Sequence, residues 1–161
     1  MGGTSTINGQ GAFGVNWVDV GYFSRHTDKL NSFQLVLIDR SDIAAGDFDF
    51  ELNYDKIQWE TGDASGGSNG LGGSSARAGW TNGGLDKFEL AGSGVNGAFL
   101  DGGPNALVSN SLNSNVDGRY TFSVRNGTVQ PPAQGVPDAG STLAMLGLAV
   151  GALFKFKSLR Q

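Results

Sequence analysis

The chain has 161 residues, of which 39% are hydrophobic, so it is long enough for one domain with a sizeable core. Its 27 glycines argue against a helical bundle, because glycine is unfavourable in helix interiors. The absence of cysteine excludes disulfides, thiolate metal sites and a cysteine nucleophile. The net charge of −4 divides into −6 for residues 1–130 and +2 for residues 131–161, which excludes the basic stripe that nucleic-acid binding requires.

Short strands separated by turn residues are predicted along the first 125 residues. The clearest is 47–54, where aromatic and aliphatic side chains alternate with polar ones, as in a half-buried strand. Residues 32–39 are apolar on both faces, which indicates a central strand, and the six-residue link to the next strand indicates an antiparallel hairpin. The other predicted strands are 12–22, 56–60, 76–80, 87–90 and 119–125. The predicted fold class is all-β, a mainly antiparallel sheet or sandwich, plus one C-terminal apolar (transmembrane) α-helix.

Two segments do not fit this pattern of strands. Residues 61–75 contain six glycines and are predicted to form a loop. Residues 91–115 are similar in composition and receive no assignment.

The composition changes after residue 126. Residues 127–137 are rich in proline and predict an extended linker. Residues 141–156 are mostly apolar and are followed by a basic end, so they predict a membrane helix with its C-terminus in the cytoplasm; the basic residues are Lys155, Lys157 and Arg160. A terminal helix packed on the sheet is the alternative, but the apolar residues surround the helix instead of forming one stripe.

Motifs for catalysis are weak. Two G-x-G-x-x-G matches, beginning at Gly9 and Gly92, are of the kind expected by chance in a glycine-rich chain, and neither opens a credible helix. His26 is the only histidine and lies in a polar turn, and Ser68 in its G-x-S-x-G match lacks the strand and helix of a nucleophile elbow. A hydrolase using Ser68 or His26 is therefore the weakest hypothesis, and we expect neither an enzyme nor a cofactor.

Four carboxylates are weak calcium candidates. Asp47, Asp49 and Glu51 lie on one face of a predicted strand, and Asp63 begins the glycine-rich loop. No recognised calcium-loop pattern is present, so a charged solvent face is the simpler explanation.

Aromatic residues are abundant, and core packing is their default role. A glycan-binding module would need two or three of them exposed side by side, next to loop 61–75. The main aromatic residues are Trp17, Phe33, Phe48, Phe50, Tyr54, Trp59, Trp80, Phe88, Tyr120 and Phe122.

The block YDKIQWETGDASGG at residues 54–67, with the surrounding residues 13–126, resembles the bacterial form of the nidogen-like extracellular domain. The resemblance implies an all-β extracellular module associated with cell-matrix adhesion and without a defined catalytic site. The first twelve residues contain no signal peptide, so we expect them to be the unstructured start of a truncated domain.

The tail, residues 136–161, resembles a PEP-CTERM-type sorting signal in its VPDSG-like form. Its motif residues are Val136, Pro137, Asp138, Ala139, Gly140 and Ser141. This resemblance implies an exosortase-like processing enzyme as a partner, transient residence in the inner membrane, and final placement at the cell surface or outside the cell. The leading hypothesis is thus a non-enzymatic exported adhesion protein whose partner is a matrix protein or polysaccharide, and the alternative is a module that binds exopolysaccharide.

Overall fold

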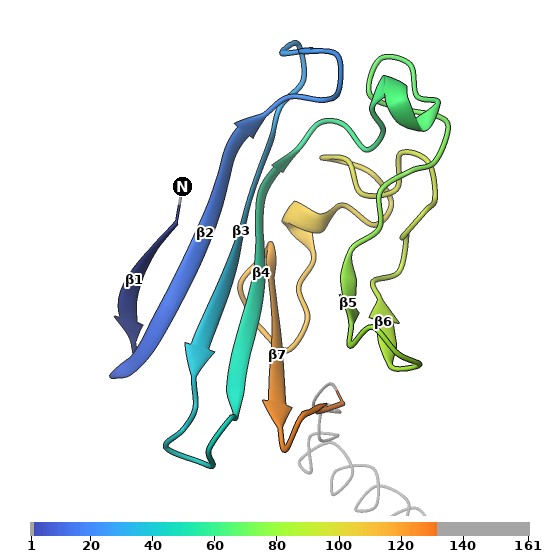
Figure 1. Ribbon diagram of the computed structural model, residues 1–161. Coiled ribbons are helices and arrows are strands. Elements are labelled where there is room, and N and C mark those ends of the chain that lie inside the picture. Colours follow the sequence, from blue (N-terminus) through green and yellow to red (C-terminus); the bar gives the residue numbers. More distant parts are fainter. Residues whose placement is uncertain (1, 132–161) are drawn as a thin grey trace, which may run out of the picture.

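The computed structural model describes residues 2–131, which form antiparallel β-sheets and two short 3-10 helices. The main sheet has six strands in the order β1-β2-β3-β4-β7-β8, and β5 and β6 form a separate hairpin (Figure 1). The strands are β1 (Gly2–Ile7), β2 (Gln10–Val20), β3 (Asn31–Asp39), β4 (Phe48–Ile57), β5 (Gly79–Thr81), β6 (Lys87–Glu89), β7 (Arg119–Arg125) and β8 (Thr128–Val129). The 3-10 helices are η1 (Asp63–Ser65) and η2 (Leu107–Ser109). The prediction of a mainly antiparallel all-β fold is confirmed for these residues.

The predicted hairpin of two long strands is confirmed in β3 and β4. In their register Leu35 lies opposite Leu52 and Leu37 lies opposite Phe50, so these side chains share one face of the sheet. We call this the inner face. Pairing with β2 on one side and β4 on the other makes β3 a central strand, as its two apolar faces predict.

The core lies on the inner face where it is covered. The β5–β6 hairpin stands beside β4 and β7, on the far side of the molecule from β1 (Figure 1). Its Phe88 meets Phe122 of β7 edge-on, with 5.9 Å between ring centroids. Across β2 and β3 the inner face is more open, because Phe13 and Leu37 are 45% and 37% exposed. The buried core cluster consists of Phe50, Ile57, Leu90, Phe99, Leu107, Tyr120, Phe122 and Val124.

The first twelve residues correct the expectation of an unstructured start. They contain β1 and the beginning of β2, which are joined by Asn8 and Gly9 with φ angles of 52° and 83°. An Asn-Gly pair with two positive φ angles is the preferred two-residue hairpin turn. This turn places Ile7 opposite Gln10 and starts a six-pair ladder.

The predicted strand 56–60 is also corrected. Its first two residues belong to β4, which ends at Ile57. The next two backbone N–H groups, of Gln58 and Trp59, donate to the side chain of Asn31 at 2.8 and 3.2 Å instead of to a neighbouring strand. The sheet therefore stops where a side chain replaces the ladder partner.

The predicted membrane helix 141–156, the basic end and the linker after residue 131 lie outside the described residues. Within residues 2–131, no helix has both the length and the apolar character needed to cross a bilayer.

Candidate functional site

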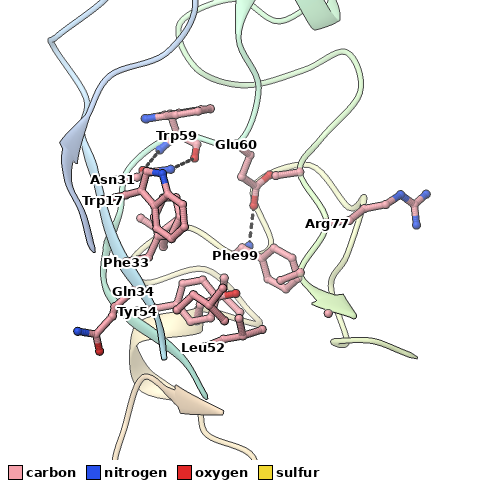
Figure 2. Close-up of a pocket in the computed structure, with 16 residues that line it drawn as sticks. Trp17, Asn31, Phe33, Gln34, Leu52, Tyr54, Trp59, Glu60, Arg77 and Phe99 are labelled. Carbon is pink, nitrogen blue, oxygen red and sulfur yellow. Dashed lines mark hydrogen bonds between the residues drawn. The ribbon is translucent and has the colours of Figure 1, made fainter. Parts of the chain in front are cut away.

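A pocket of about 360 Å³ opens between the inner face of the sheet and the segment that leads into β5 (Figure 2). Strands β2, β3 and β4 form one wall, and residues 76–79 form the opposite one. The end of β4 and the loop that carries Phe99 close it at one end. Its lining includes Trp17, Phe33, Leu35, Leu52, Tyr54, Ile57, Trp59, Glu60, Arg77, Ala78 and Phe99.

Three aromatic rings from adjacent strands follow one another along the sheet wall. The register of the strands produces this row of rings, because Phe33 of β3 lies opposite both Trp17 of β2 and Tyr54 of β4. Trp17 and Phe33 are stacked, with ring centroids 5.1 Å apart and an interplanar angle of 18°. Phe33 and Tyr54 are tilted at 6.4 Å. Trp17, 37% exposed, ends the row at the open side of the pocket.

Asn31 and Trp59 hold the closed end of the pocket in place. The Asn31 side-chain oxygen accepts the two backbone N–H groups that follow β4, and its Nδ2 donates to the carbonyl of Trp59 at 2.9 Å. The indole Nε1 of Trp59 donates to the carbonyl of Val20 at 2.8 Å. These polar groups are therefore engaged within the protein and leave apolar surface toward the cavity.

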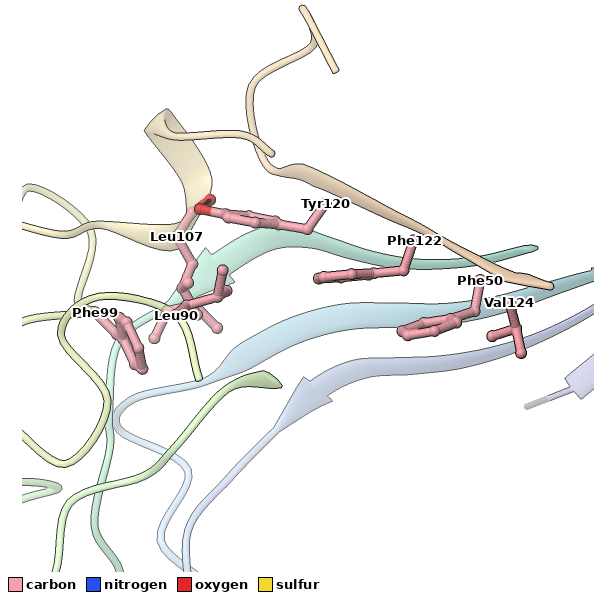
Figure 3. Packing of buried hydrophobic residues seen from close by; sticks show 8 residues of the cluster. Phe50, Leu90, Phe99, Leu107, Tyr120, Phe122 and Val124 are labelled. Atoms are coloured by element: carbon pink, nitrogen blue, oxygen red, sulfur yellow. Dashed lines mark hydrogen bonds between the residues drawn. The ribbon is translucent and has the colours of Figure 1, made fainter. Parts of the chain in front are cut away.

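Glu60 is a buried carboxylate, 3% exposed, beside the same pocket. Its two oxygens accept the backbone N–H groups of Gly97 and Phe99, each at 2.7 Å, and Figure 2 shows the bond to Phe99. Phe99 belongs both to the pocket wall and to the core cluster (Figure 3). Glu60 thus fixes the loop that joins the pocket to the core.

The charged residue at the rim turns away from the pocket. Figure 2 shows the Arg77 guanidinium pointing outward, where its Nη1 pairs with Glu89 at 2.6 Å. The pocket interior is consequently walled by apolar and aromatic groups whose charged and amide neighbours are already paired.

The Tyr54 hydroxyl is the exception to this pairing. Burial, and to a smaller extent the nearby Tyr120, raises the pKa of Tyr54 to about 12. Among residues 2–131 the Tyr54 hydroxyl has no hydrogen-bond partner; the Tyr120 hydroxyl, by contrast, donates to the carbonyl of Leu107 at 3.1 Å. The pocket wall thus offers one neutral hydrogen-bonding atom.

The predicted acidic face of β4 is covered by arginines on the outer face of the sheet. Asp49 accepts Arg40 at 2.8 Å and Arg125 at 2.6 Å, and Glu51 pairs with Arg119. Burial alone would raise the pKa of Asp49, but hydrogen bonds from its two arginines lower it overall.

The two remaining calcium candidates are engaged elsewhere. Asp47 is buried and accepts the backbone N–H of Asn126 at 2.9 Å. Asp63 lies in the glycine-rich loop and pairs with His26 at 2.9 Å. Within residues 2–131 no cluster of three or more histidine or acidic side chains is arranged to hold a metal ion, so we do not propose a calcium site.

The two hydrolase candidates are not brought together as a catalytic pair. His26 stacks on Tyr22, with 4.4 Å between ring centroids, and its Nε2 meets Asp63. Ser68 lies in a turn in which its backbone N–H donates to Leu71 at 2.8 Å. In the described part of the chain Ser68 and His26 form no hydrogen bond with each other.

The sorting residues lie outside the described residues. They are the motif Val136, Pro137, Asp138, Ala139, Gly140 and Ser141 and the basic residues Lys155, Lys157 and Arg160.

Comparison with known proteins gives two family matches. Residues 1–126 match the family described as "Nidogen-like domain", and residues 135–160 match the one described as "VPDSG-CTERM motif". Alpha-tectorin from Mus musculus and from Homo sapiens is 37% identical over 145 residues, which is 86% of this chain and 6% of the tectorin. Alpha-tectorin from Gallus gallus is 33% identical over 125 residues, covering 74% of this chain and 5% of its own. The chain thus spans a small part of these relatives, and no solved structure matches it.

Proposed function

Because the chain belongs to the nidogen-like domain family, we propose that it is a non-enzymatic bacterial adhesion protein of the cell surface or extracellular matrix. The observation that carries the proposal is the order of two family matches in one chain. An extracellular-type domain occupies residues 1–126, and a sorting motif follows at residues 135–160. Such an order fits a protein that is exported, held briefly, and then released or displayed.

The tail supplies the sorting step in this proposal. Residues 141–156 form the helix that crosses the inner membrane, and its basic end, with Lys155, Lys157 and Arg160, is on the cytoplasmic side. An exosortase-like enzyme recognises the motif that begins at Val136 and separates the domain from its anchor. The support is the motif match together with the run of apolar residues ahead of a basic end.

A reporter fusion tests the sorting step. Residues 131–161 are joined to a secreted reporter with its own signal peptide, in a bacterium that contains an exosortase-like enzyme. We expect the reporter to enter the inner-membrane fraction and then to appear in a shorter, released form. A matched fusion with Pro137→Ala and Asp138→Ala should accumulate in the membrane uncut. A reporter that never enters the membrane fraction would refute the anchor, and equal processing of the two fusions would refute the motif.

Adhesion is tested separately with the full chain. Purified protein is immobilised and incubated with matrix proteins and with exopolysaccharide from the producing organism, and the retained material is measured. Retention of a matrix protein supports the leading proposal. Retention of polysaccharide alone supports the alternative, a glycan-binding module, for which the observation in favour is the partly exposed Trp17 stacked on Phe33. If neither a matrix protein nor polysaccharide is retained, both the adhesion proposal and the glycan-binding alternative are refuted.

A further inference from the structure

The aromatic pocket between the sheet and residues 76–79 goes beyond the sorting and adhesion roles proposed above. We infer that it is a binding site for an uncharged aromatic group that carries one hydrogen-bonding atom. The inference depends on the size of the pocket, on the pairing of its polar neighbours and on the position of one hydroxyl.

Size sets the class of ligand. A volume of about 360 Å³ falls within the range of about 300–1,000 Å³ that is typical of small-molecule sites. The cavity accommodates a bicyclic ring or one large side chain, whereas an extended polymer would have to remain largely outside it.

The chemistry of the enclosed walls excludes charged and highly hydroxylated ligands from the pocket interior, whereas the glycan-binding alternative uses the exposed part of Trp17 at the open side. Asn31, Trp59 and Glu60 direct their polar atoms to backbone groups of the protein, and Arg77 pairs with Glu89 outside. A sugar or a carboxylate that entered would lose water without gaining partners, and such desolvation is unfavourable. A planar apolar ring loses little and gains contact with the rings of the wall.

Aromatic geometry favours a ring over an aliphatic chain. Trp17 and Phe33 already lie nearly parallel, and Tyr54 is tilted by 34° from Phe33. A further ring opposite this row would extend the offset-stacked and tilted pairings that aromatic groups prefer. Figure 2 shows Phe99 across the pocket from these residues, so an inserted ring would be flanked on both sides.

Tyr54 gives the site its polar preference. Its hydroxyl has no hydrogen-bond partner within residues 2–131, and like any tyrosine hydroxyl it is neutral at physiological pH. It can therefore donate to, or accept from, one atom of a bound ring. Indole and phenol have this chemistry, either as free compounds or as the side chains of a partner's tryptophan or tyrosine.

The test uses the full chain and fluorine NMR with two pairs of probes. 5-Fluoroindole is compared with fluorobenzene, which lacks the hydrogen-bonding atom, and a blocked Gly-(5-fluoro-Trp)-Gly peptide is compared with 2-deoxy-2-fluoroglucose. We expect 5-fluoroindole to bind and the fluorinated sugar not to bind. Peptide binding as strong as that of free indole identifies a protein side chain as the source, whereas indole binding alone identifies a small compound.

Three variants locate the site. Tyr54→Phe keeps the ring and should weaken 5-fluoroindole about fivefold, the effect of one neutral hydrogen bond, while leaving fluorobenzene unchanged. Trp17→Ala removes one wall and should weaken both compounds at least about tenfold. The control is Phe23→Ala, which removes an aromatic ring that is 64% exposed and does not line the pocket. Far-UV circular dichroism on each variant verifies the fold.

The outcomes separate cleanly. The inference is overturned if 5-fluoroindole does not bind to the folded wild-type chain, if the sugar binds in its place, or if Phe23→Ala weakens binding as much as Trp17→Ala. An unchanged affinity in Tyr54→Phe would overturn the part assigned to the hydroxyl. None of these results depends on whether the tail is sorted, so the failure of this inference and that of the proposed function are distinguishable.

Discussion

Replacing Glu60 by glutamine should destabilise the domain much more than its conservative chemistry implies. The carboxylate is 3% exposed, and each oxygen accepts one backbone N–H at 2.7 Å. Glutamine retains one oxygen but places an amide NH₂ against the second N–H. One charged hydrogen bond is therefore lost, the other becomes a neutral hydrogen bond, and the backbone N–H and the amide NH₂ that faces it are left without a partner in each other. Charged hydrogen bonds contribute about 1.5–3 kcal/mol, and an orphaned buried donor costs about 1–3 kcal/mol. The two energies partly describe the same lost interaction and cannot simply be added, so we expect the free energy of unfolding to fall by about 2–4 kcal/mol.

The assay is equilibrium unfolding of the full chain in urea, followed by tryptophan fluorescence at pH 7. Two of the three tryptophans, Trp17 and Trp59, line the pocket beside Glu60, so the signal reports on this region. The expected loss is a large fraction of the stability of about 5–15 kcal/mol that is typical of a domain. An unchanged m-value would show that the same surface is exposed on unfolding in both proteins.

Glu89→Gln is the matched control. It removes the same charge from an exposed pair with Arg77, whose side chain is 63% exposed, and exposed ion pairs contribute about 0–1 kcal/mol. If Glu60→Gln and Glu89→Gln shift the free energy of unfolding equally, the two hydrogen bonds of Glu60 do not hold the loop, and the reasoning is wrong.

Three further predictions concern backbone and titration. Gly118→Ala should lower the free energy of unfolding by at least about 3 kcal/mol, because φ is 77° and a Cβ would collide with the carbonyl oxygen of Tyr54. The control is Gly127→Ala, where φ is a similar 75° but a Cβ would enter open space. In the same urea assay this control should lower the free energy of unfolding by only about 1 kcal/mol. The pKa of Asp49 is lowered in the folded state, so this carboxylate stabilises the fold above its unfolded pKa, and the stabilisation disappears as pH falls below about 4. The free energy of unfolding of Asp49→Asn should therefore fall less steeply between pH 7 and pH 3 than that of the wild type. An equally steep fall in the variant would contradict the role of this carboxylate. The raised pKa of Tyr54 acts in the opposite direction: its contribution to the free energy of unfolding is fully present below about pH 10 and declines toward pH 12. In a titration followed by absorbance at 295 nm, Tyr54→Phe should show one fewer tyrosine that ionises near pH 12.

The sequence predicts the regular part of the sheet because its information there is local. Alternation along residues 119–125 predicts β7 with the bounds that the structure has. The alternating residues of β4 and the apolar faces of β3 likewise predict their hairpin. An overlooked local signal, the Asn8-Gly9 turn, would have revealed the β1–β2 hairpin as well.

The pocket could not be predicted in the same way, because it depends on register between distant strands. Trp17, Phe33 and Tyr54 are all recognisable as strand aromatics, but only the ladder shows that they lie in one row. The end of β4 is similarly non-local, since Asn31 intercepts backbone groups 27 and 28 residues further along the chain. Such side-chain interceptions have no periodic pattern that a sequence reveals.

The neighbouring positions of β4 and β7 have a consequence for folding kinetics. The two strands pair along six residues, although residues 58–118 separate them in the chain. Strands β1 to β4 follow one another in the chain and can pair successively through hairpin connections. Strand β7 can pair with β4 only after a long loop has closed, at an entropic cost. We therefore expect completion of the sheet to be the slow step, and until then the edge of β4 with its aromatic inner face stays open to aggregation.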